Sequence, residues 1–235
     1  RHSYKVEVTG SSPVGRTKKR REKMKNIIKE ILEMPYYKNY AAASGAVHNV
    51  AKHEDAVQII FEKHGLKEYA LRKKQEEGKK ELVENWLSGD LNDMQDNSFI
   101  PQPCGTHGSP DFLVKKSGRI YAIECKSSKS PRPMYNSASP KKDFIYILCS
   151  KKYNETTFFL GQDIILGSER KNFYRFIKNI KELTDDFNSK VNNSHGMTLY
   201  PRMMFQHKGK KEITDYFINQ NRAQFEQNVL EFVSG

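Results

Sequence analysis

The sequence is poor in acidic residues, in cysteine and in long apolar runs. Its 235 residues include 28 Asp and Glu against 40 Lys and Arg, so the formal net charge is +12. A basic excess of this size favours a polyanionic partner, because phosphates supply sequence-independent affinity through counterion release. DNA or RNA is therefore the expected partner, and a basic protein without such a partner is the alternative.

Cysteine occurs at only three positions, Cys104, Cys125 and Cys149. An odd number with uneven spacing argues against a disulfide framework, which indicates a reducing compartment. No run approaches the ~18 apolar residues of a membrane span, and the first residues contain no apolar signal core. We therefore expect a soluble intracellular protein, cytoplasmic and without a membrane partner.

The length suits one domain over residues 1–235. Apolar residues at helical spacing predict helices over about 17–35 and 46–64, and a further candidate over 66–87. The basic run that opens the first helix is either a solvated helix end or a phosphate contact. A long polar connection, 88–110, follows, and loops of that length are usually functional or mobile.

Runs rich in β-branched and aromatic residues predict a sheet of four or more strands. They cover residues 111–115, 119–127, 143–150 and 157–165. Two amphipathic helices follow, over about 170–187 and 212–233. The expected fold class is α/β (mixed α+β), with a central mixed sheet flanked by helices and helical additions at about 17–35 and 170–233.

Three charged residues lie at the ends of two of these strands. Alternation along the second strand places Glu124 and Lys126 on one face and Tyr121, Ile123 and Cys125 on the other. The pair Ser117-Gly118 predicts a hairpin between the first two strands. In that hairpin Asp111, at the start of the first strand, lies beside the end of the second, so two carboxylates and one ammonium group converge.

Such a group suits a magnesium ion, which prefers oxygen ligands and is typically held by one or two carboxylates with substrate phosphate completing the shell. A bound metal lowers the pKa of a coordinated water and neutralises charge on the phosphate. A neighbouring lysine can orient that water or accept its proton. Phosphodiester hydrolysis is the reaction that this pattern favours.

Pro110-Asp111, followed by Glu124-Cys125-Lys126 at the end of an apolar strand, resembles the PD-(D/E)xK nuclease superfamily, most closely the type II restriction endonucleases. The resemblance covers about residues 44–166 as an α-β-β-β catalytic core. It implies a restriction-endonuclease-like fold in which Asp111 and Glu124 bind Mg²⁺ and Lys126 assists the attacking water. It also implies site-specific cleavage of double-stranded DNA, a homodimer and a cognate DNA methyltransferase.

Glu54 interrupts the apolar stripe of the second predicted helix. A carboxylate on a core face is costly unless it is paired or bound to a metal. Members of the family often place a helical Glu beside the active site, which Glu54 resembles, so it joins the candidate catalytic set; the alternative is a buried partner of an Arg or Lys. The adjacent His53 is expected to be a satisfied histidine at the boundary of the core.

A polar loop over residues 127–142 follows the strand that carries Glu124 and Lys126. The family's architecture places that loop near the DNA, and an ordinary solvated loop is the alternative. Asn and Ser side chains contact base edges or phosphates, and Lys and Arg contact phosphates or guanine. The candidate DNA-binding residues are Lys129, Arg132, Asn136, Ser137, Ser139, Lys141 and Lys142.

Other functions stay open on the sequence. A repair or recombination nuclease, such as a junction resolvase or a nicking enzyme, has the same chemistry, and a DNA-binding protein without turnover keeps the fold alone. An RNA-directed nuclease is a further alternative, because basic charge does not distinguish the nucleic acids. The sequence has no phosphate-binding loop and no dinucleotide fingerprint, which speaks against nucleotide hydrolysis. Cys104 and His107 have half of a zinc-site spacing, without a second pair.

Overall fold

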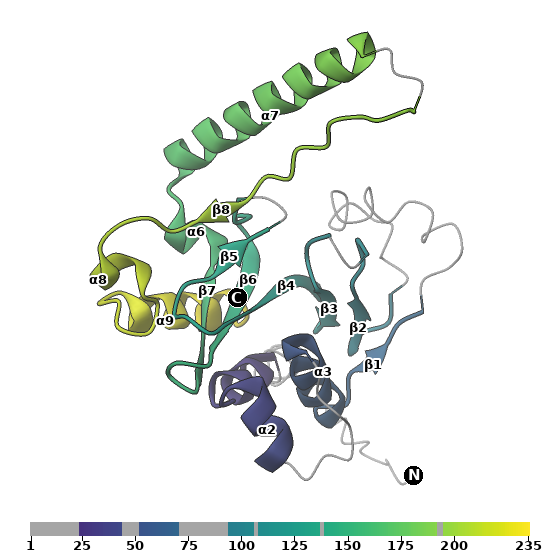
Figure 1. Ribbon diagram of the computed structural model, residues 1–235. Helices are drawn as coiled ribbons and strands as arrows, with labels where there is room; N and C mark the ends of the chain where they lie inside the picture. The colour runs from purple at the N-terminus through teal and green to yellow at the C-terminus, as the bar shows by residue number, and fades with distance from the viewer. Residues whose placement is uncertain (1–23, 44–51, 71–93, 106–107, 137–138, 192–194) are drawn as a thin grey trace, which may run out of the picture.

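A six-stranded mixed sheet, in the order β1-β2-β3-β4-β6-β7, forms the centre of the molecule, and β5 and β8 form a second, two-stranded sheet (Figure 1). The structure, a computed structural model, describes residues 24–43, 52–70, 94–105, 108–136, 139–191 and 195–235. The strands are β1 (Lys67–Glu68), β2 (Ser98–Pro101), β3 (Phe112–Lys116), β4 (Arg119–Ser128), β5 (Met134–Tyr135), β6 (Phe144–Ser150), β7 (Glu155–Leu160) and β8 (Phe205–Gln206). The predicted mixed sheet of four or more strands is therefore confirmed.

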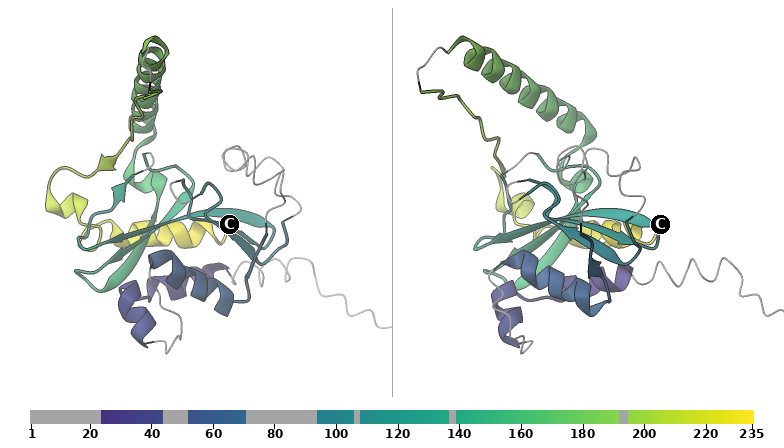
Figure 2. Two further views of the ribbon diagram at one scale, coloured as in Figure 1. Left: turned by 45° about the vertical axis from the view of Figure 1, so that its right-hand side comes forward. Right: turned by 90° about the vertical axis from the view of Figure 1, so that its right-hand side faces the viewer.

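Helices flank the sheet. They are α2 (Tyr37–Ala43), α3 (His53–Lys63), α6 (Gly161–Ile164), α7 (Gly167–Lys190), α8 (Lys211–Thr214) and α9 (Arg222–Phe232), and residues 24–32 are also helical. Figures 1 and 2 show α2 and α3 below the sheet and α7 standing out from the body above it. Across the described residues, no helix combines the length and the apolar content that crossing a membrane requires.

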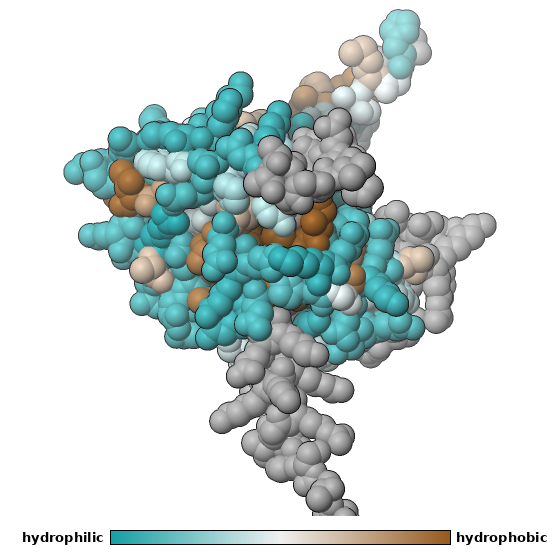
Figure 3. All heavy atoms as spheres, turned by 90° about the horizontal axis from the view of Figure 1, so that it is seen from below, coloured by the Kyte–Doolittle hydropathy of each residue, from teal (hydrophilic) through white to brown (hydrophobic). Residues whose placement is uncertain are grey.

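The two faces of the sheet carry two apolar cores, as strand alternation requires. Tyr121, Ile123 and Cys125 of β4 belong to the cluster that includes the apolar residues of helices 24–32, α3 and α9. Ala122 of β4 belongs to the other cluster, with residues from β6, β7 and the C-terminal segment. Seen from below, the face with α2 and α3 is mostly hydrophilic, with apolar side chains gathered near its middle (Figure 3).

The predicted hairpin between β3 and β4 is confirmed. Lys116 pairs with Arg119, so Ser117 and Gly118 form a two-residue turn. Both have positive φ, 56° and 76°, which is the backbone conformation of a type I′ turn. The turn fixes the register of the two strands and therefore the position of Asp111 relative to Glu124.

Two boundaries in the first half of the chain differ from the prediction. The prediction of a helix over 66–87 was wrong at its start, because Lys67–Glu68 form β1 and pair in parallel with β2. Residues 71–87 lie outside the described part of the chain. The polar connection 88–110 contains β2, which pairs with β3. Both strands are too short for a period in the sequence, and tertiary pairing determines them: β1 pairs with β2, and β2 pairs with β3.

Two boundaries in the second half differ as well. The strand expected to continue to residue 165 ends at Leu160, whose N–H donates to Asp163 Oδ2 at 2.9 Å and so begins α6. The helix expected over 212–233 is divided into α8 and α9. The break lies at Asp215, which is fully buried and accepts a hydrogen bond from Tyr153 Oη at 2.7 Å. This buried contact overrides the helical period of the sequence.

Candidate active site

The end of β4 and the start of β3 bring the three predicted charged residues together. Lys126 Nζ donates to Glu124 Oε1 at 2.5 Å, and the two side chains lie on the same face of β4. Asp111 directly precedes β3, and its Oδ2 accepts a hydrogen bond from the N–H of Cys125 at 2.7 Å. Asp111 is therefore joined to the strand residue that lies between the other two.

Glu124 is held on both of its oxygens. Besides Lys126 at Oε1, Ser109 Oγ donates to Oε2 at 2.7 Å. The carboxyl group is buried, with 4% of the residue exposed. Each of these hydrogen bonds is therefore electrostatically stronger than it would be in water. Sequence reasoning missed Ser109, and its position just before Pro110-Asp111 was the available signal.

The environment of Asp111 disfavours its charge. Burial, together with the neighbouring Glu124 carboxylate, raises the pKa of this carboxyl to about 7, and the N–H of Cys125 opposes the shift. Glu54 also raises the pKa of Asp111, whereas Lys126 lowers it. Three carboxylates near one another, with one ammonium group among them, make a site with an excess of negative charge.

These side chains line a cleft of about 510 Å³. Glu54 lines it from α3 and is half-buried. No Lys or Arg in the described part of the chain forms a salt bridge with Glu54, so the alternative of a buried ion pair has no support there. The residues that line the cleft are Glu54, Gly108, Asp111, Glu124, Cys125, Lys126, Ser127, Ser128, Ser130, Arg132, Pro133, Met134, Asn136, Arg202, Gln206 and His207.

The opposite wall of the cleft comes from two segments far apart in the chain. Arg132 and Asn136 lie in the predicted DNA-binding loop, and Arg202, Gln206 and His207 lie about 70 residues later. The β5–β8 ladder, in which Met134 pairs with Gln206, brings the segments together. Sequence reasoning left the second segment unassigned, because a two-residue ladder leaves no periodic signal.

Hydrogen bonds join the two segments of this wall to each other and to Tyr216. His207 Nε2 and Tyr216 Oη lie 2.7 Å apart, and Arg202 Nε donates to the carbonyl of Asn136 at 3.3 Å. Burial lowers the pKa of His207, with Arg132 adding to the effect, so the neutral form of the imidazole is favoured. The wall therefore presents its positive charge at the two arginines.

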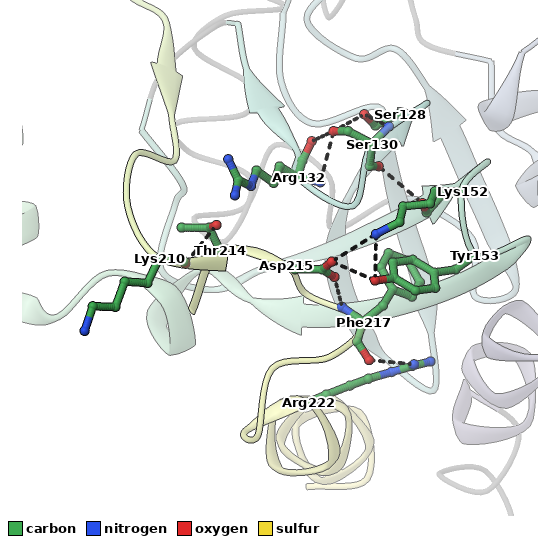
Figure 4. A network of polar contacts seen from close by, with 11 residues as sticks. Ser128, Ser130, Arg132, Lys152, Tyr153, Lys210, Thr214, Asp215, Phe217 and Arg222 are labelled. Atoms are coloured by element: carbon green, nitrogen blue, oxygen red, sulfur yellow. Dashed lines mark hydrogen bonds and ion pairs between the residues drawn. The ribbon is translucent and has the colours of Figure 1, made fainter. Parts of the chain in front are cut away.

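Figure 4 shows how the loop and the C-terminal segment are anchored. In the loop, Ser130 Oγ accepts a hydrogen bond from the N–H of Arg132 at 3.3 Å and lies 3.0 Å from Ser128 Oγ. In the C-terminal segment, Asp215 binds Tyr153 and lies 3.6 Å from Lys152 Nζ. The loop contacts join residues that themselves line the cleft, and the contacts of Asp215 join the C-terminal segment to the turn between β6 and β7.

The remaining candidates of the DNA-binding loop are placed differently. Lys129 and Lys142 are exposed, whereas Ser139 is buried with 2% exposed. Lys141 lies beside the cleft, where its Nζ donates to the carbonyl of Ser109 at 3.4 Å and lies 4.8 Å from the centre of the Phe144 ring. Ser137 lies outside the described residues, as does His107.

Asp111 and Glu124 are the residues of the cleft that could bind a cation together. Within the described residues, no group of three or more His, Cys, Asp or Glu side chains could hold a metal ion by itself. A site with two carboxylates supplies only part of a ligand shell, and water or substrate phosphate completes such a shell for Mg²⁺.

No protein-family model matches the chain, and no curated protein or solved structure matches it. The resemblance to the PD-(D/E)xK nucleases therefore rests on the residues of the cleft and on their order along the chain. The geometry on which a function can be built is two buried carboxylates, one lysine and a facing wall with two arginines.

Proposed function

We propose that the protein is a Mg²⁺-dependent endonuclease that hydrolyses phosphodiester bonds in double-stranded DNA at specific sequences, as type II restriction endonucleases of the PD-(D/E)xK superfamily do. One observation carries the proposal: Asp111, Glu124 and Lys126 meet at one strand end in a cleft of about 510 Å³. The net charge of +12 supports a nucleic acid as the substrate, because it favours binding to a phosphate backbone.

The donor set fits a divalent cation. Burial and the neighbouring Glu124 raise the pKa of Asp111, so a positive charge between the two carboxylates would offset an unfavourable arrangement. Asp111 and Glu124 would hold Mg²⁺, and Mg²⁺ when bound would make a water molecule more acidic and neutralise charge on the phosphate.

The chain's own residues then position the reaction. Ser109 and Lys126 orient the Glu124 carboxylate, and the N–H of Cys125 orients Asp111. Lys126 orients the attacking water, whose oxygen bonds to phosphorus while the bond to the leaving oxygen breaks. The proton of the water passes to a base or to solvent, and the leaving oxygen takes up a proton.

The facing wall supplies binding. Arg132 and Arg202 can donate paired hydrogen bonds to phosphate oxygens or to guanine. The side-chain amides of Asn136 and Gln206 can form a donor and acceptor pair with adenine. Carboxamide side chains on the wall of the cleft support site-specific cleavage over cleavage of any sequence, because they can form hydrogen bonds with base edges.

Incubation of the purified protein with a long duplex DNA of known sequence, with Mg²⁺ or with EDTA, tests the proposal. We expect discrete fragments with Mg²⁺, none with EDTA, and none with Lys126→Ala under either condition. Lys151→Ala is the matched control, since Lys151 is exposed in the turn between β6 and β7 and does not line the cleft. The ends of the fragments would give the sequence that is recognised.

Other results would assign other functions. Nicks confined to branched DNA would indicate a repair nuclease, and cleavage of RNA alone would indicate an RNA-directed nuclease. Tight, salt-sensitive DNA binding without cleavage under any divalent metal would overturn the catalytic assignment and leave a DNA-binding protein.

A further inference from the structure

Two stretches of the sequence lack acidic residues altogether. They are residues 125–142, which follow Glu124, and residues 187–211, which end before Glu212. Each stretch contains five Lys and Arg residues, so the remaining 30 Lys and Arg against 28 Asp and Glu leave the rest of the chain at +2. The β5–β8 ladder pairs the two stretches and brings part of each to the wall of the cleft, which concentrates the basic excess there.

Three lysines of the second stretch come directly after this wall. We define the lysine run as Lys208, Lys210 and Lys211, which follow the cleft residue His207 and lead from β8 into α8 (Figure 1). All three residues are exposed. None of them lines the cleft, so the contacts that we assign to its wall leave the lysine run without a role.

The lysine run differs from other exposed lysines in having no acidic partner in the described part of the chain. Elsewhere, Lys63 Nζ lies 2.6 Å from Glu30 Oε1, and Lys178 Nζ lies 3.5 Å from Glu182 Oε1. A lysine that is already paired gains less from a phosphate, because the existing ion pair must first be given up. The charges of the lysine run face no such competition.

The body of the protein holds the backbone of the lysine run in place. The carbonyl of Lys210 accepts a hydrogen bond from Thr214 Oγ1 at 3.1 Å, and the carbonyl of Lys211 accepts one from the N–H of Asp215 at 2.9 Å. Asp215 is itself fully buried and bound by Tyr153. Figure 4 shows the side chain of Lys210 extending away from this network. A ligand therefore has to order the lysine side chains but not their backbone.

The lysine run begins where the electrostatic potential is already positive. Arg132 contributes to the lowered pKa of His207, which is the effect of a nearby positive charge. The N–H of Tyr216 donates to the carbonyl of Pro131 at 3.4 Å, so the segment after the lysine run is joined to the loop that carries Arg132. The lysine run therefore continues the basic wall beyond the cleft.

The length of this segment suits a nucleic-acid backbone. From His207 to Lys211 an extended chain spans at most about 14 Å. One strand of duplex DNA carries a phosphate about every 3.4 Å of helix axis, so a segment of this length passes about four phosphates. Three ammonium groups distributed over it can each meet a different phosphate.

We propose that the lysine run binds the phosphate backbone of duplex DNA just outside the cleft, and that it holds the duplex there without reading its sequence. Duplex DNA as the ligand follows from the proposed function, on which this inference rests. Lysine suits the task because its ammonium group is a point charge on a flexible stem and contacts phosphate without a fixed geometry. Each such contact releases condensed counterions, so it adds to the salt dependence of binding.

Fluorescence anisotropy of a labelled duplex, titrated with the protein in EDTA at salt concentrations from about 50 to about 200 mM, tests the assignment. For Lys208→Ala/Lys210→Ala/Lys211→Ala we expect the slope of log association constant against log salt to become shallower by about 2 to 3. At about 0.1 M salt the dissociation constant should rise on the order of 10²-fold. An unchanged slope would overturn the proposal, as would a natural chain that does not bind duplex DNA.

Two matched variants separate a local contact from the effect of net charge. Lys208→Arg/Lys210→Arg/Lys211→Arg keeps the charges and should keep the slope. Lys29→Ala/Lys38→Ala/Lys67→Ala removes the same charge from exposed positions on the helix 24–32, α2 and β1, and should change the slope by less than about 1. A loss in this control equal to that in the lysine run would mean that net charge alone acts, and the proposal would be wrong.

The choice of ligand is tested with the same variants. Duplexes of two unrelated sequences should lose affinity by the same factor, because phosphate contacts carry no sequence information. A loss confined to one sequence would indicate contacts with bases instead and would overturn the proposal. Loss of binding to anionic phospholipid vesicles, with DNA affinity unchanged, would assign the lysine run to a membrane surface and would also overturn it.

Failure of the nuclease proposal is distinguishable, because binding is measured in EDTA without cleavage. A chain that cuts no DNA but shows the expected change in slope would keep the lysine run as a DNA contact. A chain that cuts DNA with an unchanged slope in the triple alanine variant would lose this inference alone.

Discussion

The cleft and helix α7 depart from the usual distribution of side chains in opposite directions. In the cleft, the carboxyl-bearing Glu124 is 4% exposed, and burial disfavours the charge of Asp111. On α7, Phe176 and Leu183 are apolar and more than half exposed. A buried polar group and an exposed apolar patch are the two informative exceptions to the rule that apolar residues lie inside.

The two regions differ in what offsets the cost of a buried polar group or of an exposed apolar one. Glu124 has donors at both oxygens, so the chain itself offsets part of the cost of burying its charge. The apolar stripe of α7 formed by Phe176, Leu183 and Phe187 has no comparable cover in the described part of the chain. The cleft is therefore organised by contacts of the chain itself, whereas this stripe is left exposed.

The largest effect is expected at the cleft. Glu124→Gln keeps the size of the side chain but removes its negative charge, so Mg²⁺-dependent cleavage should fall on the order of 10³-fold, which corresponds to about 4 kcal/mol. Single-turnover cleavage of a duplex that contains the recognised site measures the loss. Glu62→Gln on the exposed side of α3 is the control, and activity that persists in Glu124→Gln would remove Glu124 from the active site.

The second prediction compares a buried phenylalanine, Phe112, with an exposed one, Phe176. Phe112 is 2% exposed and its ring lies 5.3 Å from that of Phe61, so Phe112→Ala should cost about 3 kcal/mol of the free energy of unfolding. Phe176→Ala on α7, where the side chain is exposed, should cost less than about 0.5 kcal/mol. Urea unfolding measures both, and equal losses would contradict the exposed position of Phe176.

The third prediction concerns the cost of charge in the cleft. Burial raises the pKa of Asp111 from an ordinary value of 3.8 to about 7, so the folded state binds a proton that the unfolded state has released. The contribution of Asp111 to the free energy of unfolding is therefore greatest below pH 3.8 and is lost as pH rises through 7. Asn cannot ionise, so Asp111→Asn avoids the cost of a buried charge at high pH. The variant should be more stable than the natural chain by on the order of 2 kcal/mol at about pH 8, and by less at about pH 5.

Urea unfolding in EDTA at the two pH values measures this difference, because a bound cation would hide it. Asp96→Asn, at an exposed position near the β3–β4 turn, is the control for the change of residue type. A variant less stable than the natural chain at the higher pH would show that the Asp111 carboxylate is well accommodated.

The smallest effect is expected at His53, a buried polar residue behind the cleft. Both ring nitrogens lack a hydrogen-bond partner in the described part of the chain, and burial lowers the pKa of His53 to about 3. Below the ordinary pKa of 6.5, His53 binds a proton in the unfolded chain but stays neutral in the folded chain. The free energy of unfolding therefore falls as pH drops from 6.5 toward 3.

His53→Leu should reduce the loss of stability between pH 7 and pH 5 by about 1.5 kcal/mol. Unfolding curves of the two proteins at both pH values check this, and parallel pH dependences would show that His53 is protonated in the folded state. The expectation of a satisfied histidine at the boundary of the core was wrong, because the ring lies fully inside.

The convergence of Asp111, Glu124 and Lys126 could be predicted because each step is local. Strand alternation puts Glu124 and Lys126 on one face, and the turn at Ser117 and Gly118 sets the register that brings Asp111 alongside. These rules act over a few residues and need no knowledge of the rest of the chain. The roles of these residues stay a prediction until cleavage is measured.

The facing wall could not be predicted in the same way. Arg202, Gln206 and His207 reach the cleft through a ladder of two residue pairs between β5 and β8. Such a ladder has no period in the sequence, and its partners lie about 70 residues apart. The division between α8 and α9 was missed for the same reason, since the burial of Asp215 against Tyr153 is a contact between distant segments.

The sequence by itself determined the basic charge, the strands β3, β4 and β6, the amphipathic α7 and the grouping of charged residues at one strand end, because composition and short-range periodicity are local properties of a chain. Only the tertiary structure decided that the second wall of the cleft comes from the segment after α7 and that the apolar stripe of α7 faces outward. Which side of an amphipathic helix is covered depends on what packs against it, and distant segments supply that cover.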